Sequence, residues 1–294
     1  MLNKIATTVE SDKGGAELRS AWTGEAPVSP QSLPTQPVAA QTGGRQHGWL
    51  SRLRSYFVFD PLIWAYTIVL GSISLLTSLF DKSGRVQHRL ATAWSWLIMK
   101  TILSPVAVTG NASALAADAG GRPRVFAVTH ASALDIPVLY VYLPFQFRIV
   151  FKSELLSYPF IGWHLKRSGQ VCINQQNPSA SIGAIKSALR SLRSGMPLVI
   201  FPEGGRTPNG EIQPFLPGAF FLAIKAQAEI VPIALAGTFE LLPMNTYHIK
   251  SRPLEMRVGG VISTAGMTLA ETEAVSARVK AAIEDLAGQP SLGD

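Results

Sequence analysis

The chain has 294 residues, with 26 Lys and Arg against 19 Asp and Glu; 47% of the residues are hydrophobic and only 15% are charged. This composition excludes a chain that is disordered throughout and favours contact with a membrane. The basic excess suits an anionic lipid surface or a phosphorylated substrate. Nucleic acid is not an expected partner, because the sequence has no zinc-finger, basic-zipper or RNP pattern.

Residues 1–48 are rich in Ser, Thr, Gln, Pro, Gly and Ala and show little apolar periodicity. Such a segment cannot bury a core, so we predict a disordered leader. It contains no apolar stretch of the signal-peptide kind, and secretion is therefore not expected. The single cysteine, Cys172, fits a reducing compartment and a packed thiol.

Residues 49–109 form the next predicted unit, a helical segment that associates with a membrane. Within it, residues 61–80 are an uncharged apolar run of membrane-spanning length, PLIWAYTIVLGSISLLTSLF. A second apolar run, Leu90–Val108, is interrupted by Lys100 and Pro105. Both flanks of the first run are basic, so the positive-inside rule gives no clear orientation.

One arrangement agrees with basic residues on both flanks of the apolar run. A helical hairpin that dips into the membrane from its cytoplasmic face keeps both ends on one side, with Trp64, Trp94 and Trp96 at the interface. The expected location is therefore the cytoplasmic face of a membrane, as an integral or monotopic protein. A single full span and two buried helices of a soluble domain stay open as alternatives.

Residues 110–294 are predicted to form an α/β domain, in which strand and helix patterns alternate from about residue 124. The strand candidates are Arg124–Thr129, Phe147–Phe151, Gln170–Ile173, Pro197–Phe201, Ile230–Leu235 and Leu254–Ile262. The helix candidates run to Leu143 after the first strand, over Ser181–Ser194 and Leu216–Glu229, and on from a capping box of Thr268 and Glu271. This alternation predicts a mostly parallel, mixed sheet flanked by helices.

A histidine and an aspartate follow the first of these strands, at His130 and Asp135. Histidine can take a proton near neutral pH, and a carboxylate can fix its tautomer and stabilise its charged form. Residues five apart do not face each other on one helix. We therefore expect His130 in the turn before a helix and Asp135 in its first turn, where Pro137 also fits. A surface turn with an incidental histidine is the alternative.

A second charged loop, Phe201–Thr207, follows another buried strand. It holds the carboxylate of Glu203, two glycines that allow close backbone approach, and the guanidinium of Arg206, which suits bidentate phosphate binding. Because ligands gather at the carboxyl ends of parallel strands, both loops are expected at one sheet edge. A tight turn with a solvated ion pair would produce the same pattern.

Four motifs in this order resemble those of the glycerolipid acyltransferase family, and most closely those of the 1-acyl-glycerol-3-phosphate acyltransferases. The segments that carry the resemblance are His130-x4-Asp135, Phe151–Leu155 with Pro159–Trp163, Phe201–Thr207 and Ile230–Ala234. The similarity extends over roughly residues 85–262. The chain also lacks the G-x-S-x-G and H-E-x-x-H patterns of two hydrolase classes.

The resemblance implies direct transfer of an acyl group from a thioester to a lysophospholipid hydroxyl. His130 would be the general base and Asp135 its partner, while Glu203, Gly204, Gly205 and Arg206 would belong to the acceptor site. The implied donor is acyl-CoA or acyl carrier protein, the partners are membrane lipids and the lysophospholipid, and no bound cofactor or metal is expected. A thioester is already activated, so no covalent enzyme intermediate is needed.

One position departs from the family pattern. The second motif usually ends in an arginine that binds the acceptor phosphate, and Gln175 stands in its place. Lys152 and Arg206 can still hold a phosphate, so lysophosphatidic acid stays the first expectation. A lyso-amino-acid lipid or a zwitterionic lysophospholipid is the alternative acceptor. A catalytically silent lipid-binding protein and a thioesterase are the rival functions.

Overall fold

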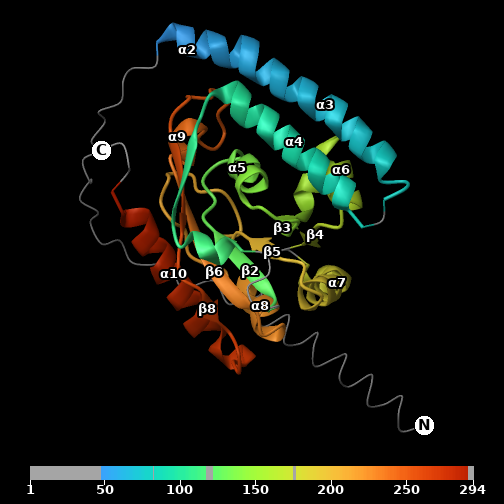
Figure 1. Cartoon of the computed structure of the whole chain (residues 1–294), viewed down its shortest axis with the longest axis vertical. Coiled ribbons are helices and arrows are strands. Elements are labelled where there is room, and N and C mark those ends of the chain that lie inside the picture. The colour runs from blue at the N-terminus through green and yellow to red at the C-terminus, as the bar shows by residue number, and fades with distance from the viewer. Residues whose placement is uncertain (1–47, 82, 117–121, 175–176, 291–294) are drawn as a thin grey trace.

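The computed structural model describes residues 48–81, 83–116, 122–174 and 177–290 (Figure 1). Gly48 is the only residue of the predicted leader in these ranges, so that prediction lies outside the described residues. The described chain forms a mixed sheet with helices on both faces and a long apolar helix along one side (Figure 1). The predicted fold class is therefore confirmed.

The described residues form an eight-stranded sheet in the order β1-β7-β6-β2-β5-β3-β4, with β8 also paired to β6. Pairing is parallel except between β6 and β7 and between β6 and β8. The strands are β1 Val106–Gly110, β2 Arg124–Val128, β3 Arg148–Lys152, β4 Val171–Ile173, β5 Leu198–Ile200, β6 Glu229–Ala236, β7 Leu254–Val258 and β8 Ile262–Ser263.

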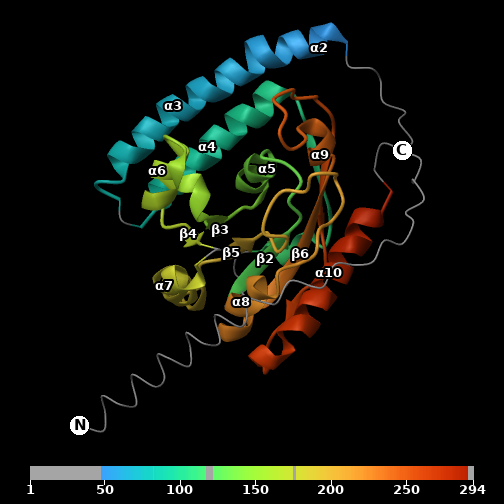
Figure 2. The same ribbon diagram turned by 180° about the vertical axis from the view of Figure 1, so that it is seen from behind.

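Helices cover both faces of this sheet, as the two opposite views show (Figures 1 and 2). On one face lie α3 Asp60–Thr77, α4 Arg85–Ile102, α5 Asp135–Tyr142 and α6 Ile161–Arg167; on the other lie α7 Ile182–Arg193, α8 Phe221–Lys225 and α10 Thr272–Gly288. The short α9, Thr238–Leu241, follows β6. Strand β2 is buried on both sides, with Phe126 in the α4–α5 core and Val125 in the α7–α10 core. Alternating side chains of one strand thus serve both layers, as expected of a central parallel strand.

The apolar hairpin is present, but its two helices differ in their surroundings. Helix α2, Trp49–Arg54, continues through a π-helical turn, Ser55–Phe59, into α3. The continuous helix Trp49–Thr77 is long and apolar enough to cross a membrane, and only 17% of its most apolar window is buried. Helix α4 instead packs on α5 and buries Ile98 and Ile102 completely. The second helix is therefore part of the domain core.

The apolar run Leu90–Val108 contains two elements. Helix α4 ends at Ile102, Leu103 takes a left-handed conformation with φ 56°, and β1 begins at Val106. The interruption at Pro105 thus marks a boundary, because proline cannot continue a helix. Strand β1 pairs with β7, so the sheet begins inside the segment that the sequence assigned to the membrane unit.

Trp94 lies between the two helices of the hairpin. Its Nε1 donates a hydrogen bond of 3.0 Å to Thr67 Oγ1 of α3, and its ring packs against the core. Trp64 and Trp96 are half exposed, at 56% and 50%. Of the three predicted interface tryptophans, Trp94 therefore holds the hairpin together instead of facing outward.

Two further elements are shorter than expected. The predicted helix Leu216–Glu229 consists of a 3-10 turn, Pro217–Phe220, and the five residues of α8; Gln227 has φ 52° and the chain enters β6 at Glu229. The predicted strand Leu254–Ile262 is divided at Gly259, whose N–H bonds to Pro232 O as the chain turns back along β6. The capping box of Thr268 and Glu271 is present and starts the 3-10 turn before α10.

Candidate active site

His130 and Asp135 lie together at the carboxyl end of β2. His130 is in the turn that follows the strand, and Asp135 is the first residue of α5. The distance between His130 Nδ1 and Asp135 Oδ2 is 2.9 Å. Asp135 is fully buried, and His130 keeps 17% of its side chain exposed. The structure thus has the turn-and-helix geometry that the five-residue spacing predicts.

The aspartate is held by backbone as well as by the imidazole. The same Oδ2 accepts hydrogen bonds from Ala131 N at 2.8 Å and from Ser132 N at 2.9 Å. It also lies at the amino end of α5, where the helix dipole favours a negative charge. An ionised carboxylate only accepts, so His130 donates from Nδ1 and its Nε2 is free to take a proton.

The aromatic ring of Phe201, which follows β5, covers the imidazole. The two ring centroids are 4.0 Å apart and the planes differ by 21°, a stacked arrangement. Because β2 and β5 are adjacent parallel strands, the two residues meet at the same sheet edge. The stacking fixes the plane of the imidazole, while the hydrogen bond to Asp135 fixes its rotation.

Glu203 binds the backbone of the histidine turn. Its Oε1 accepts from His130 N at 2.8 Å, and its Oε2 accepts from Gln213 N at 2.9 Å. In the opposite direction, Thr207 N donates to His130 O at 2.9 Å. Burial raises the pKa of Glu203 above its usual value, and the two backbone N–H groups act against this shift. The Glu203 carboxylate therefore acts as a clamp that holds the Phe201–Thr207 loop against the turn that carries His130.

The remaining predicted acceptor residues gather beside this clamp. Gly204 has φ 69°, a left-handed conformation that suits glycine. A Cβ atom at Gly205 would lie 3.4 Å from Lys152 Nζ, so this lysine, the last residue of β3, reaches the loop. Arg206 is exposed at the same turn. Gln175 lies outside the described residues.

The segment that contains most of these residues matches a known family. Residues 106–236 fit the family model described as Acyltransferase. Over 203 residues the chain is 30% identical to the chloroplastic 1-acyl-sn-glycerol-3-phosphate acyltransferase LPAT1 of Arabidopsis thaliana. The chain belongs to the acyltransferase family. The match with LPAT1 covers 68% of this chain and 56% of that protein.

Two other members of the acyltransferase family extend the comparison. The chain is 32% identical over 155 residues to human 1-acyl-sn-glycerol-3-phosphate acyltransferase beta. This match covers 52% of this chain and 56% of that protein. The crystal structure of the acyltransferase PlsC from Thermotoga maritima has a TM-score of 0.64 at 21% identity and covers 82% of this chain and 97% of that one. This structural likeness shows the fold. The chain spans about half of the length of the two curated relatives.

Four contributors to the site around His130 received no role from the sequence. Phe201 and Thr207 lie inside the noted motif, but nothing in the motif says that they touch the histidine. Gln213, ten residues beyond Glu203, donates its backbone N–H to that carboxylate and carries no sequence signal. Ser132 Oγ donates to Leu242 O at 2.9 Å and anchors the histidine turn to the segment after α9.

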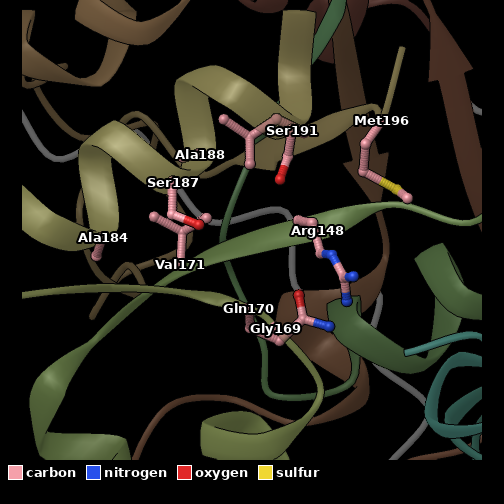
Figure 3. A pocket seen from close by; sticks show the side chains of 10 residues that line it. Arg148, Gly169, Gln170, Val171, Ala184, Ser187, Ala188, Ser191 and Met196 are labelled. Carbon is pink, nitrogen blue, oxygen red and sulfur yellow. The ribbon is translucent and has the colours of Figure 1, made fainter. Parts of the chain in front are cut away.

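A small cavity of about 180 Å³ lies elsewhere, beside α7 and the amino ends of β3, β4 and β5 (Figure 3). Arg148, Gln170 and Ser187 are among its lining residues. Arg148 donates to Ser168 O and to Ser83 O, so its guanidinium ties α6 and the α3–α4 connection to the sheet. The cavity is at the sheet edge opposite His130 and contains no predicted site residue.

Proposed function

We propose that this protein transfers an acyl group from a thioester to the free hydroxyl of lysophosphatidic acid and so produces phosphatidic acid. The observation that carries the proposal is the 2.9 Å contact between His130 and Asp135 at a sheet edge that also holds Lys152 and Arg206. A base and a cationic site for the acceptor phosphate thereby stand side by side. The names of the relatives support this acceptor.

His130 is the general base of the proposed reaction. Its Nε2 takes the proton of the acceptor hydroxyl while the oxygen attacks the thioester carbonyl, and Asp135 stabilises the imidazolium. The tetrahedral intermediate then loses its C–S bond, and the leaving thiolate takes the proton back from Nε2. A positioned base of this kind contributes about 10²- to 10⁴-fold to the rate. No covalent bond to the protein forms.

The acceptor phosphate is proposed to bind Lys152 and Arg206, with the backbone of Gly204 and Gly205 close to it. Two cations suit a phosphate, and glycines permit its close approach. Both oxygens of Glu203 already accept backbone N–H groups. Glu203 therefore serves the acceptor site by holding His130 in place rather than by binding the acceptor itself.

The donor is proposed to be acyl-CoA or acyl carrier protein, and no bound cofactor takes part. The protein is proposed to lie on the cytoplasmic face of a membrane, from which the lipid acceptor reaches the site. The apolar helix Trp49–Thr77 supports association with a membrane, because its exposed face carries Trp49, Phe57 and Trp64 among its large side chains. An exposed apolar helix alongside an α/β domain suits an enzyme whose substrates dissolve in a bilayer.

Gln175 favours a second candidate, an acyltransferase for another lysolipid such as a zwitterionic lysophospholipid or a lyso-amino-acid lipid. Glutamine donates a hydrogen bond but adds no charge to the acceptor site. A panel of lysolipid acceptors with the wild type and Gln175→Arg separates the two. Our proposal expects lysophosphatidic acid to be the best acceptor of the wild type. A wild type that prefers an uncharged or zwitterionic acceptor, with Gln175→Arg restoring lysophosphatidic acid, would contradict it.

The same panel tests the rival classes of function. A silent lipid-binding protein would bind every lysolipid without forming a diacyl product. A thioesterase would release free fatty acid at the same rate with or without an acceptor. The proposal expects product to form only when both donor and acceptor are present.

A further inference from the structure

A compact group of exposed apolar side chains lies in the catalytic domain itself, outside the apolar hairpin. Leu155, Tyr158, Ile161 and Trp163 are exposed by 39%, 55%, 37% and 49%. Leu155 belongs to the 3-10 turn η4, Ser153–Ser157, Tyr158 directly follows that turn, and Ile161 and Trp163 belong to α6. The other exposed large apolar side chains in the described part of the domain are scattered along it, at Leu103, Val108, Leu216, Tyr247 and Val261.

This group continues the exposed face of α3. A Cβ atom on Gly71 of α3 would lie 3.1 Å from Phe160 Cβ, and Ser74 Oγ lies 2.7 Å from His164 Nδ1. Helices α3 and α6 therefore touch along one seam, which both views show (Figures 1 and 2). Leu76 at the adjoining end of α3, and Leu79 and Phe80 in the turn after it, are also exposed.

A strained residue holds the group in this position. Phe160 has φ 59° and ψ −55°, a conformation that is costly for a residue with a side chain. The turn directs the Phe160 ring against Gly71, with Trp163 beside it at a centroid distance of 5.3 Å. The contacts of the Phe160 ring with Gly71 and Trp163 offset the cost of this conformation and hold α6 against α3.

The charges around the group suit the headgroups of anionic lipids. Lys166 and Arg167 are exposed in the last turn of α6, and Glu154 is the acidic residue of the same segment. Tyrosine and tryptophan favour the boundary between hydrocarbon and water, and basic residues favour an anionic surface. A soluble protein partner would not account for continuity with a helix as apolar as α3.

We propose that η4 and α6 form a second membrane-contact segment, which seats Tyr158 and Trp163 in the headgroup region of the anionic bilayer that binds the exposed face of α2 and α3. The proposal rests on the lipid acceptor of the proposed function. Because η4 directly follows β3, whose last residue is Lys152, this contact holds the phosphate-binding edge of the sheet at headgroup depth.

A fluorescent label reports the contact without requiring turnover. Full-length His130→Ala, Cys172→Ser protein carries an environment-sensitive dye on Tyr158→Cys and is mixed with vesicles of mixed zwitterionic and anionic phospholipids. The matched control carries the dye on Val261→Cys; Val261 is 40% exposed and directly precedes β8, a strand that lies far from α3 (Figure 1). The emission at position 158 is expected to shift to shorter wavelength and to be quenched by brominated lipids, whereas position 261 stays in water.

A second measurement removes the aromatic contact. Trp163→Ser is expected to weaken flotation with anionic vesicles on the order of tenfold, and Val261→Ser to leave it unchanged. A dye at position 158 that responds no more than the dye at position 261 would overturn the proposal. A shift that appears without vesicles and grows with protein concentration would also overturn it, because it would indicate contact with a second copy of the chain. None of these readouts depends on acyl transfer.

Discussion

Replacement of Glu203 by glutamine distinguishes two roles that this residue can have: positioning of His130 and direct binding of the acceptor. In the structure its two oxygens accept backbone N–H groups from His130 at 2.8 Å and from Gln213 at 2.9 Å. Glutamine keeps one acceptor oxygen and turns an NH₂ group toward the other backbone N–H. The substitution therefore removes one charge-assisted hydrogen bond from the clamp around the histidine and leaves the side-chain volume nearly unchanged.

The expected cost follows from that lost bond. A hydrogen bond to a charged acceptor at a half-buried site contributes about 2 to 3 kcal/mol. If the lost hydrogen bond positions His130, the transition state loses about 2 to 3 kcal/mol of stabilisation. At 1.36 kcal/mol for each factor of ten, kcat then falls about 30- to 150-fold. The KM for the lysolipid is expected to stay within about twofold, because both oxygens of the carboxylate already accept backbone N–H groups.

Initial rates over a range of lysophosphatidic acid concentrations measure both constants. Glu211→Gln is the matched control, since Glu211 lies on the same loop, is exposed, and its carboxylate accepts a hydrogen bond from the side chain of its neighbour Asn209 at 2.7 Å. It is expected to retain both constants. A Glu203→Gln protein with unchanged kcat and a KM raised tenfold or more would refute this reasoning and assign Glu203 to direct acceptor binding.

Three further predictions concern the pair and the scaffold. Asp135→Asn, which weakens the acceptor of three hydrogen bonds, should lower kcat by about 10²- to 10⁴-fold with circular dichroism unchanged; activity within threefold of wild type would exclude the proposed pair. Burial lowers the pKa of His164 to about 4 from 6.5, so the neutral ring stabilises the fold above pH 6.5 and this contribution, at most about 3 kcal/mol, is lost as the pH falls toward 4. The Tm should fall over that range, and less so in His164→Asn; equal slopes would contradict the assignment. Arg257→Met leaves buried Glu255 without its 2.8 Å partner and should cost about 3 to 5 kcal/mol in thermal unfolding, whereas Lys280→Ala at an exposed pair should cost under about 0.5; equal losses would show that burial of the pair is unimportant.

The histidine and its aspartate could be placed from the sequence because the constraint is local. Five residues separate them, a buried strand precedes them, and a helix with an early proline follows. These facts leave one arrangement in which the two side chains meet, and the structure has it. The neighbouring position of the Phe201–Thr207 loop was also predictable, since adjacent parallel strands end at one edge.

The clamp on the histidine could not be predicted, because it depends on tertiary contacts of the backbone. The N–H of Gln213 is the same chemical group in any residue except proline, so no sequence pattern marks it as a partner of Glu203. The sequence also did not predict which of the two helices of the hairpin is buried in the domain. Both lie in apolar runs, although α4 carries Arg85, Arg89 and Lys100 and α3 has no basic residue. Helix α4 packs on α5 and α3 does not, and the packing of the domain decides which of them stays exposed.

The boundary after α4 shows how a local signal can be noticed and still be misread. Pro105 and Lys100 were visible as interruptions of an apolar run, yet the run continues into Val106–Gly110, where it is a strand. Hydropathy does not distinguish a buried helix from a buried strand over so few residues. The pairing of β1 with β7, some 150 residues away in the chain, settles the matter.

The most direct test of the central claim is acyl transfer by the purified full-length protein with and without His130. Wild type, supplied with an acyl thioester and lysophosphatidic acid, should form phosphatidic acid and release one thiol for each product molecule. Folded His130→Ala should lose this turnover by about 10²-fold or more, since the base is gone. A folded His130→Ala protein that forms phosphatidic acid at the wild-type rate would contradict the account.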